Sequence, residues 1–133
     1  MNWKLIFSLS MFGIAMAVAG LFGLTRHVEP LLWLAIFIFY AGWIAKHVPS
    51  KLFLHGFLVS VVNGVWIAII HAAFHSTYLE NNPEMLEDYQ KFSQYMNPQT
   101  MMLIIGPCIG AITGVVAGLL AMIAGRILKV KPV

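Results

Sequence analysis

Four long apolar segments separated by short polar stretches dominate the pattern of this chain. A membrane-spanning helix needs about 20 mainly apolar residues, because each residue adds about 1.5 Å and the hydrocarbon core of a bilayer is about 30 Å thick. Apolar runs predict spans at about residues 3–24, 30–45, 52–74 and 100–128, and no other run is long enough. The pattern therefore predicts an all-α, polytopic membrane protein with four transmembrane helices, folded as one domain over residues 1–133.

The short connections between the spans indicate how the helices are arranged. Residues 25–29 and 46–51 leave room for little more than a turn, so neighbouring spans should pack as antiparallel hairpins. Lys4 and the later Ala17-Val18-Ala19 match the layout of a secretory signal with its cleavage site. Because the apolar run continues past Gly20, we expect an uncleaved first helix instead.

The connection between the third and fourth spans has a helical pattern of its own. Pro83 suits the first position of a helix, and Asn97-Pro98 suits its end. The apolar side chains of this segment fall on one helical face, at Met85, Tyr89, Phe92 and Met96. We expect a short amphipathic helix at about residues 83–96, lying outside the membrane on the lipid headgroups or capping the bundle.

Charge is scarce and unevenly distributed. Hydrophobic residues make up 60% of the sequence and charged residues only 10%, whereas a soluble domain carries about 25% charged residues. Most of the basic residues fall on the side of the two chain ends: Lys4, Lys46, Lys51, Arg126, Lys129 and Lys131. Cytoplasmic segments are enriched in lysine and arginine, so we expect both termini in the cytoplasm. The acidic residues all fall on the opposite side: Glu29, Glu80, Glu84, Glu87 and Asp88.

A glycine repeat marks the fourth span as a packing surface. In lipid, helices associate by close backbone approach through small residues, because the hydrophobic effect does not drive them together. The repeat has one glycine every four residues, at Gly106, Gly110, Gly114 and Gly118. We expect this glycine zipper to pack against Gly13 and Ala17 of the first span, or to form the interface of a homo-oligomer or of a complex with a larger membrane protein.

The polar residues inside the spans exclude some transport mechanisms. Proton relays and pumps place ionisable side chains at mid-membrane depth, and no Asp, Glu, Lys or Arg lies near the middle of a predicted span. Ser60 and Asn63 instead form part of a polar face on the third span. We expect Asn63 to form a hydrogen bond to another helix; the alternative is contact with a pore or a substrate.

Two histidines near the end of the third span are candidate metal ligands. His71 and His75 are four residues apart, the spacing with which a helix presents two imidazoles to one zinc ion. The nearby outer segments add Glu80, His27 and Glu29. Zinc or another divalent metal suited to imidazole and carboxylate is therefore a candidate cofactor, and an interfacial, hydrogen-bonded histidine pair is the alternative.

Motifs for catalysis and for nucleic-acid binding are absent from the sequence. Residue 72 is Ala, so no HExxH motif is present, and there is no GxSxG or CxxC motif. The single cysteine, Cys108, lies in an apolar run. No basic patch with interleaved aromatic residues suggests nucleic acid as a partner. We predict no catalytic residues and expect that the protein is not an enzyme.

Three sequence features together resemble a known group of proteins. They are the polar entry to the third span, FLHGFLVSVVNG, the acidic segment ENNPEMLEDYQKFSQYMNP, and the glycine-rich last span ending in GRILKVK. In these features the chain resembles a family of small bacterial four-span inner-membrane proteins of unknown function. The resemblance implies the same topology and an inner-membrane location, and it supplies no catalytic residues.

Three hypotheses for the function follow from these patterns. The leading one is a non-enzymatic membrane protein that acts by helix–helix assembly, with itself or with a membrane partner, through the glycines of the last span. The second is divalent metal binding or transport by the histidine and glutamate cluster. The third is a channel or transporter for small solutes.

Overall fold

The computed structural model describes residues 1–129, and every secondary-structure element in that part of the chain is an α-helix. The elements are α1 (Trp3–Leu21), α2 (Glu29–His47), α3 (Leu52–Ala73), α4 (His75–Asn81), α5 (Pro83–Phe92) and α6 (Pro98–Lys129). Four of them, α1, α2, α3 and α6, are long and apolar enough to cross a membrane. The four predicted spans are therefore confirmed as helices, with ends that differ by up to three residues.

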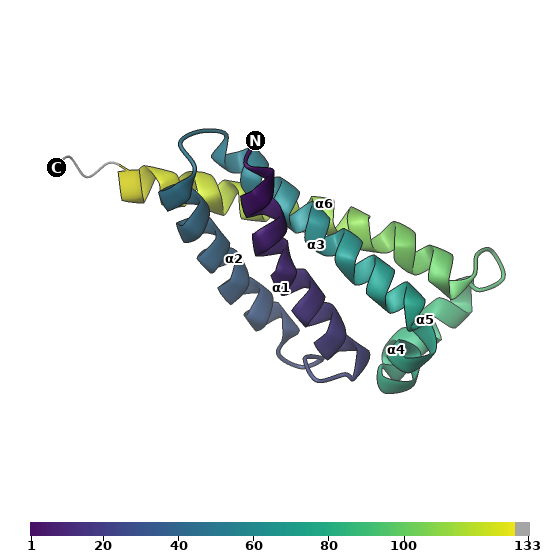
Figure 1. Ribbon diagram of the computed structural model, residues 1–133. Coiled ribbons are helices and arrows are strands. Elements are labelled where there is room, and N and C mark those ends of the chain that lie inside the picture. The colour runs from purple at the N-terminus through teal and green to yellow at the C-terminus, as the bar shows by residue number, and fades with distance from the viewer. Residues whose placement is uncertain (130–133) are drawn as a thin grey trace.

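The four long helices run back and forth between the two ends of the molecule (Figure 1). Met1, the connection at residues 48–51 and the last turns of α6 lie toward one end, which we call the terminal end. The connection between α1 and α2 lies at the other end with α4 and α5, and we call this the cap end. Lys4, Lys46, Lys51 and Arg126 of the predicted basic set therefore lie toward the terminal end, and the acidic residues lie toward the cap end. Lys131 of that set lies outside the described residues.

The cap end differs from the sequence prediction. Phe74 has non-helical backbone angles, φ −116° and ψ 38°, so α3 ends there and a separate helix, α4, begins at His75. The predicted amphipathic helix at residues 83–96 exists as α5 but ends at Phe92, with turns after it. No residue of α5 is fully buried, so this helix covers the bundle only partly.

Glycines bring α3 and α6 into backbone contact. A Cβ atom added to Gly110 would lie 2.8 Å from the Ser60 carbonyl oxygen, and one added to Gly56 would lie 2.6 Å from the Ala117 carbonyl oxygen. Real Cβ atoms do not approach that closely, so only glycine fits at these positions. The other predicted zipper glycines also lie against α3, opposite residues 53–68: Gly106, Gly114 and Gly118.

The structure therefore corrects the predicted intrachain partner of the glycine zipper, which was the first span. The zipper packs on α3, whereas Gly13 and Ala17 of α1 are buried at a different contact with α3, beside Asn63 and His71. Glycine spacing indicates that another backbone comes close, but it does not indicate which one. α3 contributes two glycines to this contact. Gly56 lies against Ala117 and Gly118, and Gly64 lies against Gly106 and Gly110.

The hydrophobic core is divided between the two ends. The main cluster joins α1, α2, α3 and α6 in the terminal half, through Ile6, Leu9, Phe37, Tyr40, Ile44, Val48, Val59, Ala117 and Ala121. A second, smaller cluster joins α3, α4 and α6 at the cap end, through Ala72, Leu79 and Met102, with Tyr78, Leu86 and Tyr89 packed against it. The first half of α2 has no residue in this second cluster, so space remains between α2 and the other helices in the cap half.

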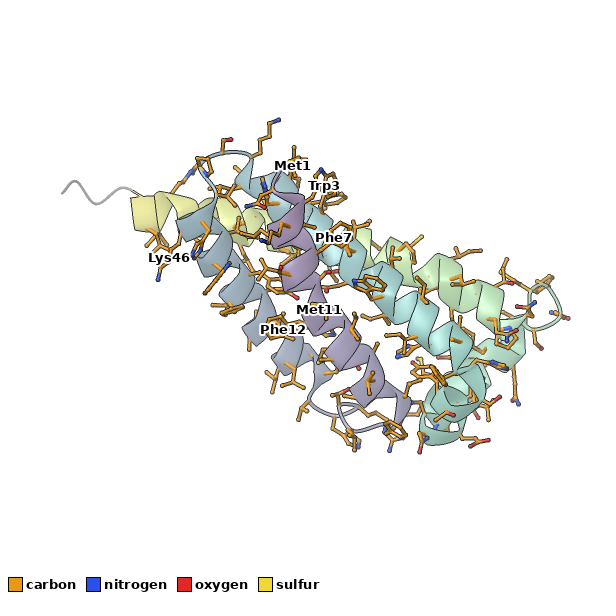
Figure 2. The ribbon with its side chains drawn as sticks, viewed as in Figure 1. Met1, Trp3, Phe7, Met11, Phe12 and Lys46 are labelled. Atoms are coloured by element: carbon orange, nitrogen blue, oxygen red, sulfur yellow. The ribbon has the colours of Figure 1, made fainter. Side chains whose placement is uncertain are left out.

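The outer surface of α1 is apolar along its length. Trp3, Phe7 and Met11 are four residues apart, and their exposed fractions are 51%, 51% and 57%. Their side chains point outward along α1 in Figure 2. An exposed apolar stripe of this kind suits a helix that faces lipid, because a soluble protein rarely exposes large contiguous apolar patches.

Candidate functional site

A pocket of about 590 Å³ occupies the space between α2 and the other helices. Most of its wall is apolar, and α2, α3, α5 and α6 contribute nearly all of it. The apolar and aromatic lining residues include Trp33, Phe37, Ile67, Ala68, Met85, Phe92, Met101, Met102, Ile105 and Ile109. On α6 alone the lining runs from Met101 to Thr113, which corresponds to roughly 18 Å along a helix axis. The pocket therefore extends from the cap end deep into the apolar bundle.

The deep end of the pocket carries hydroxyl groups. The Ser60 and Thr113 hydroxyls lie 2.9 Å apart in hydrogen-bond contact between α3 and α6. The Thr113 hydroxyl also donates to the Ile109 carbonyl, at 2.8 Å. Both residues line the pocket, so they form a small polar group at the bottom of an apolar space.

Asn63 lies beside these hydroxyls and joins three helices. Its Oδ1 accepts a hydrogen bond from the Gly13 backbone N–H at 3.1 Å, and its Nδ2 donates to the Tyr40 hydroxyl at 3.1 Å. The Tyr40 hydroxyl in turn donates to the Leu9 carbonyl at 2.9 Å. Asn63 is 2% exposed and Tyr40 is 0% exposed. The expected hydrogen bond from Asn63 to another helix is confirmed, and this network pins α1 and α2 to α3.

The cap end of the pocket carries two carboxylates. Glu29, in the first turn of α2, accepts a hydrogen bond from the Trp33 indole N–H at 3.3 Å. Asp88 of α5 pairs with Lys91 at 3.5 Å, and both of these side chains are more than half exposed. Glu29 and Asp88 are the only charged residues in the described lining of the pocket. The cap end of the pocket is therefore negative.

Two tyrosines stand beside these carboxylates. Burial raises the pKa of Tyr78 to about 12, and the nearby Tyr89 and Glu29 add to the effect. Burial also raises the pKa of Tyr89 above its usual value. Both phenols therefore remain neutral at physiological pH, where they offer hydroxyl groups and aromatic faces but no negative charge. The Tyr78 ring stacks on His71, with ring centroids 4.1 Å apart.

The predicted metal ligands do not gather into one site. Nε2 of His71 donates to the Ala17 carbonyl at 3.1 Å, while Nδ1 of His75 contacts Nε2 of Gln99 at 3.1 Å. His27 and Glu80 are exposed, and Glu29 lines the pocket. Within residues 1–129, no group of three or more His, Cys, Asp or Glu side chains could hold a metal ion.

The physical reason for this correction is the helix break at Phe74. The prediction required one continuous helix, so that residues four apart would share a face. Phe74 interrupts α3 between the two histidines, and His75 starts a new helix. His71 instead faces α1, where its Nε2 donates a hydrogen bond to the Ala17 carbonyl near the end of that helix. Nδ2 of Asn82 donates to the Gly20 carbonyl of the same helix, at 2.9 Å.

Sequence reasoning identified part of this pocket. Ser60 and Asn63 of the predicted polar face line it, as do Gly106 and Gly110 of the predicted packing face. The residues that give the cap end its chemistry were not predicted as a site: Trp33, Tyr78, Asp88 and Tyr89. The available signal was that every acidic residue falls at residue 29 or between residues 80 and 88, in or beside two connections that also contain aromatic residues.

No protein-family model, curated protein or solved structure matches this chain significantly. The helices themselves define the class of protein. Four of them are long and apolar enough to cross a membrane, and large apolar side chains cover their outer surfaces. The chain therefore belongs to the class of helical integral membrane proteins.

Proposed function

We propose that this protein is a non-enzymatic membrane protein that binds a small amphipathic molecule in the pocket between α2, α3, α5 and α6. The observation that carries the proposal is the pocket itself, at about 590 Å³. Small-molecule sites typically measure about 300–1,000 Å³ and combine apolar walls with a few polar groups that orient the ligand. This pocket has that combination, with hydroxyls at the deep end and carboxylates at the cap end.

The location of the pocket favours a ligand that is soluble in lipid. Three of the four main walls belong to helices long enough to span a membrane, and the lining extends roughly 18 Å along α6. A ligand with an apolar body would fill the space beside Ile67, Ile105 and Ile109, while its polar head would remain at the cap end.

The proposal includes an orientation in the membrane. We propose that the helices cross as two antiparallel hairpins, with both termini in the cytoplasm and with α4 and α5 outside. The support is the charge asymmetry: Lys4, Lys46, Lys51 and Arg126 belong to the terminal end, and the acidic residues belong to the cap end. A bacterial inner membrane is proposed on the resemblance of the sequence motifs alone.

Assembly through the glycine zipper is less favoured than ligand binding. The zipper glycines already have an intrachain partner, because added Cβ atoms there would meet α3 at 2.6–2.9 Å. That face is not free to pack against a second copy or another membrane protein. Metal binding is also disfavoured, since the histidines are held by the Ala17 carbonyl and by Gln99.

Photolabelling with a neutral amphiphile tests the proposal. The protein, in nanodiscs of zwitterionic lipid, is irradiated with an alkyl maltoside that carries a diazirine in its chain. Adducts should concentrate on the pocket-lining parts of α2 and α6. Ile109→Trp should reduce them, because Ile109 lines the pocket and is 54% exposed, so that a larger side chain can fill the space without disturbing the core.

Ile112→Trp is the matched control. Ile112 is also on α6 and is 71% exposed, but it does not line the pocket. It should leave the labelling unchanged. If adducts instead spread evenly over the lipid-facing surfaces, including Trp3, Phe7 and Met11 of α1, then the pocket is not a binding site and the proposal is wrong.

A further inference from the structure

We infer that the polar head of the ligand is an organic cation, an amine or quaternary ammonium group, held at the cap end by Glu29, Asp88 and the aromatic rings of Trp33, Tyr78 and Tyr89. This inference rests on the proposed function, and it adds the chemical class of the ligand. It depends on the charges around the mouth of the pocket, on their partners and on the aromatic residues beside them.

The charged residues that line the pocket are of one sign, although Lys91 lies beside one of them. The lining contains Glu29 and Asp88 but no lysine or arginine. Among the described side chains, those of residues 1–128, the only ion pair is Lys91 with Asp88, at 3.5 Å between side chains that are 68% and 61% exposed. An exposed pair of this kind contributes little, so Asp88 can exchange its partner at small cost. Glu29 has no cationic partner in the same part of the chain.

Aromatic residues line the pocket together with the carboxylates, and two of them lie close to Glu29. Trp33 is fixed beside Glu29 by the hydrogen bond from its indole N–H, and Tyr78 is close enough for Glu29 to raise its pKa. Tyr89 lies near Tyr78 and lines the same pocket. Ammonium groups bind over the faces of such rings, and the attraction grows when water is excluded. The neutral phenols add attraction for a cation without competing for the carboxylates.

The same arrangement disfavours other head groups. A phosphate or carboxylate on the ligand would meet Glu29 and Asp88 with no lysine or arginine in the lining to offset the repulsion. The imidazole of His71 does not serve this role, because its Nε2 donates to the Ala17 carbonyl. The geometry therefore favours a cationic head group over an anionic or zwitterionic one.

Competition with the neutral photoprobe tests this inference. Three dodecyl amphiphiles, with trimethylammonium, phosphocholine and maltoside heads, each compete below their critical micelle concentrations for labelling of the pocket. The trimethylammonium compound should displace the probe at about tenfold lower concentration than the other two, the ratio expected for about 1.4 kcal/mol of added attraction.

Glu29→Gln should remove most of that preference, measured as the ratio of the displacing concentrations of the three amphiphiles within each variant. Glu84→Gln is the matched control, because Glu84 also lies in the first turn of a helix beside a proline but does not line the pocket. Each amphiphile partitions into the bilayer to the same extent whichever variant is present. Comparing the variants therefore cancels this partition.

The outcomes separate this inference from the proposed function. Equal displacement by the three head groups, with pocket labelling intact, would overturn the cationic head and leave amphiphile binding standing. Loss of the preference in Glu84→Gln as well as in Glu29→Gln would overturn the role of Glu29, because it would indicate a general surface-charge effect. Absence of pocket labelling in the wild type would overturn the proposed function, and this inference with it.

Discussion

The amide oxygen of Asn63 on α3 accepts a hydrogen bond from the backbone N–H of Gly13 on α1, at 3.1 Å. A Cβ atom added to Gly13 would lie 2.5 Å from that oxygen and 2.9 Å from the Asn63 Cα. The missing side chain at residue 13 is therefore what lets Asn63 reach the backbone of the neighbouring helix. In lipid, where no water replaces a lost partner, such a bond fixes which faces of two helices meet.

Gly13→Ala should destabilise the protein by about 1–3 kcal/mol, because the added methyl group overpacks the contact between α1 and α3. Unfolding by sodium dodecyl sulfate, followed by circular dichroism, measures the change. Gly42→Ala is the control, since a Cβ there meets nothing within 4 Å. Alanine favours a helix more than glycine does, so Gly42→Ala should be neutral or stabilising. Equal effects of both substitutions would contradict the role of Gly13.

Tyr40→Phe should cost about 1–2 kcal/mol of stability. The substitution removes the hydroxyl that donates to the Leu9 carbonyl and accepts from Asn63, and both groups are buried. Tyr95→Phe serves as the control, because Tyr95 is 79% exposed. The same detergent unfolding assay compares the two variants. If Tyr40→Phe were as stable as the wild type, the hydrogen bonds of the Tyr40 hydroxyl would not contribute to stability.

Gly110→Ala should weaken the fold of a single chain without changing its state of association. The added Cβ would lie 2.8 Å from the Ser60 carbonyl oxygen, so α3 and α6 must separate. Native mass spectrometry from nanodiscs should give the same subunit number for Gly110→Ala and wild type, while unfolding requires less detergent for the variant. A change in subunit number with unchanged stability would instead favour the assembly hypothesis.

The two histidines should respond differently to substitution. His71→Ala removes the bond to the Ala17 carbonyl and the stacking on Tyr78, so it should lower stability by about 1–2 kcal/mol. His75→Ala should have little effect, because its contact with Gln99 is exposed. Zinc should not change the melting temperature of the wild type. A zinc-dependent rise that disappears in both variants would restore the metal hypothesis.

Alkaline pH should destabilise the wild type more than Tyr78→Phe. The pKa of Tyr78 is raised to about 12, so the unfolded chain releases this proton near pH 10 while the folded protein keeps it. Stability is therefore unaffected below pH 10 and falls between pH 10 and about 12, by at most about 1.4 kcal/mol per pH unit. Detergent unfolding across this range measures the difference. Parallel curves for the two proteins would contradict the raised pKa.

The sequence was sufficient to predict the four long helices, because apolar length alone separates such a helix from other structures. It was not sufficient to place the end of α3. The backbone angles of Phe74 break the helix, but the residues on both sides of Phe74 are helical, so their sequence does not mark the break. For this reason the predicted metal ligands do not gather into one group, since the prediction assumed that His71 and His75 share one helical face.

The sequence was also not sufficient to predict which helix packs against the glycines of α6. The glycines at 106, 110, 114 and 118 indicated a close approach, but small residues occur on both α1 and α3. Only the three-dimensional arrangement distinguishes them. The pocket needed still more information, because its walls come from helices that are distant in sequence, and α2 contributes only its first half.

The uneven distribution of the core has a consequence for how a ligand reaches the pocket. The main cluster, around Tyr40, Ile44 and Ala121, closes the bundle in its terminal half, whereas the pocket occupies the cap half. In the proposed orientation these two halves lie at the depths of different leaflets. The proposed ligand would then reach the pocket from the leaflet around α4 and α5, whereas an amphiphile in the opposite leaflet would first have to cross the bilayer. The proposed site would therefore sample the composition of a single leaflet.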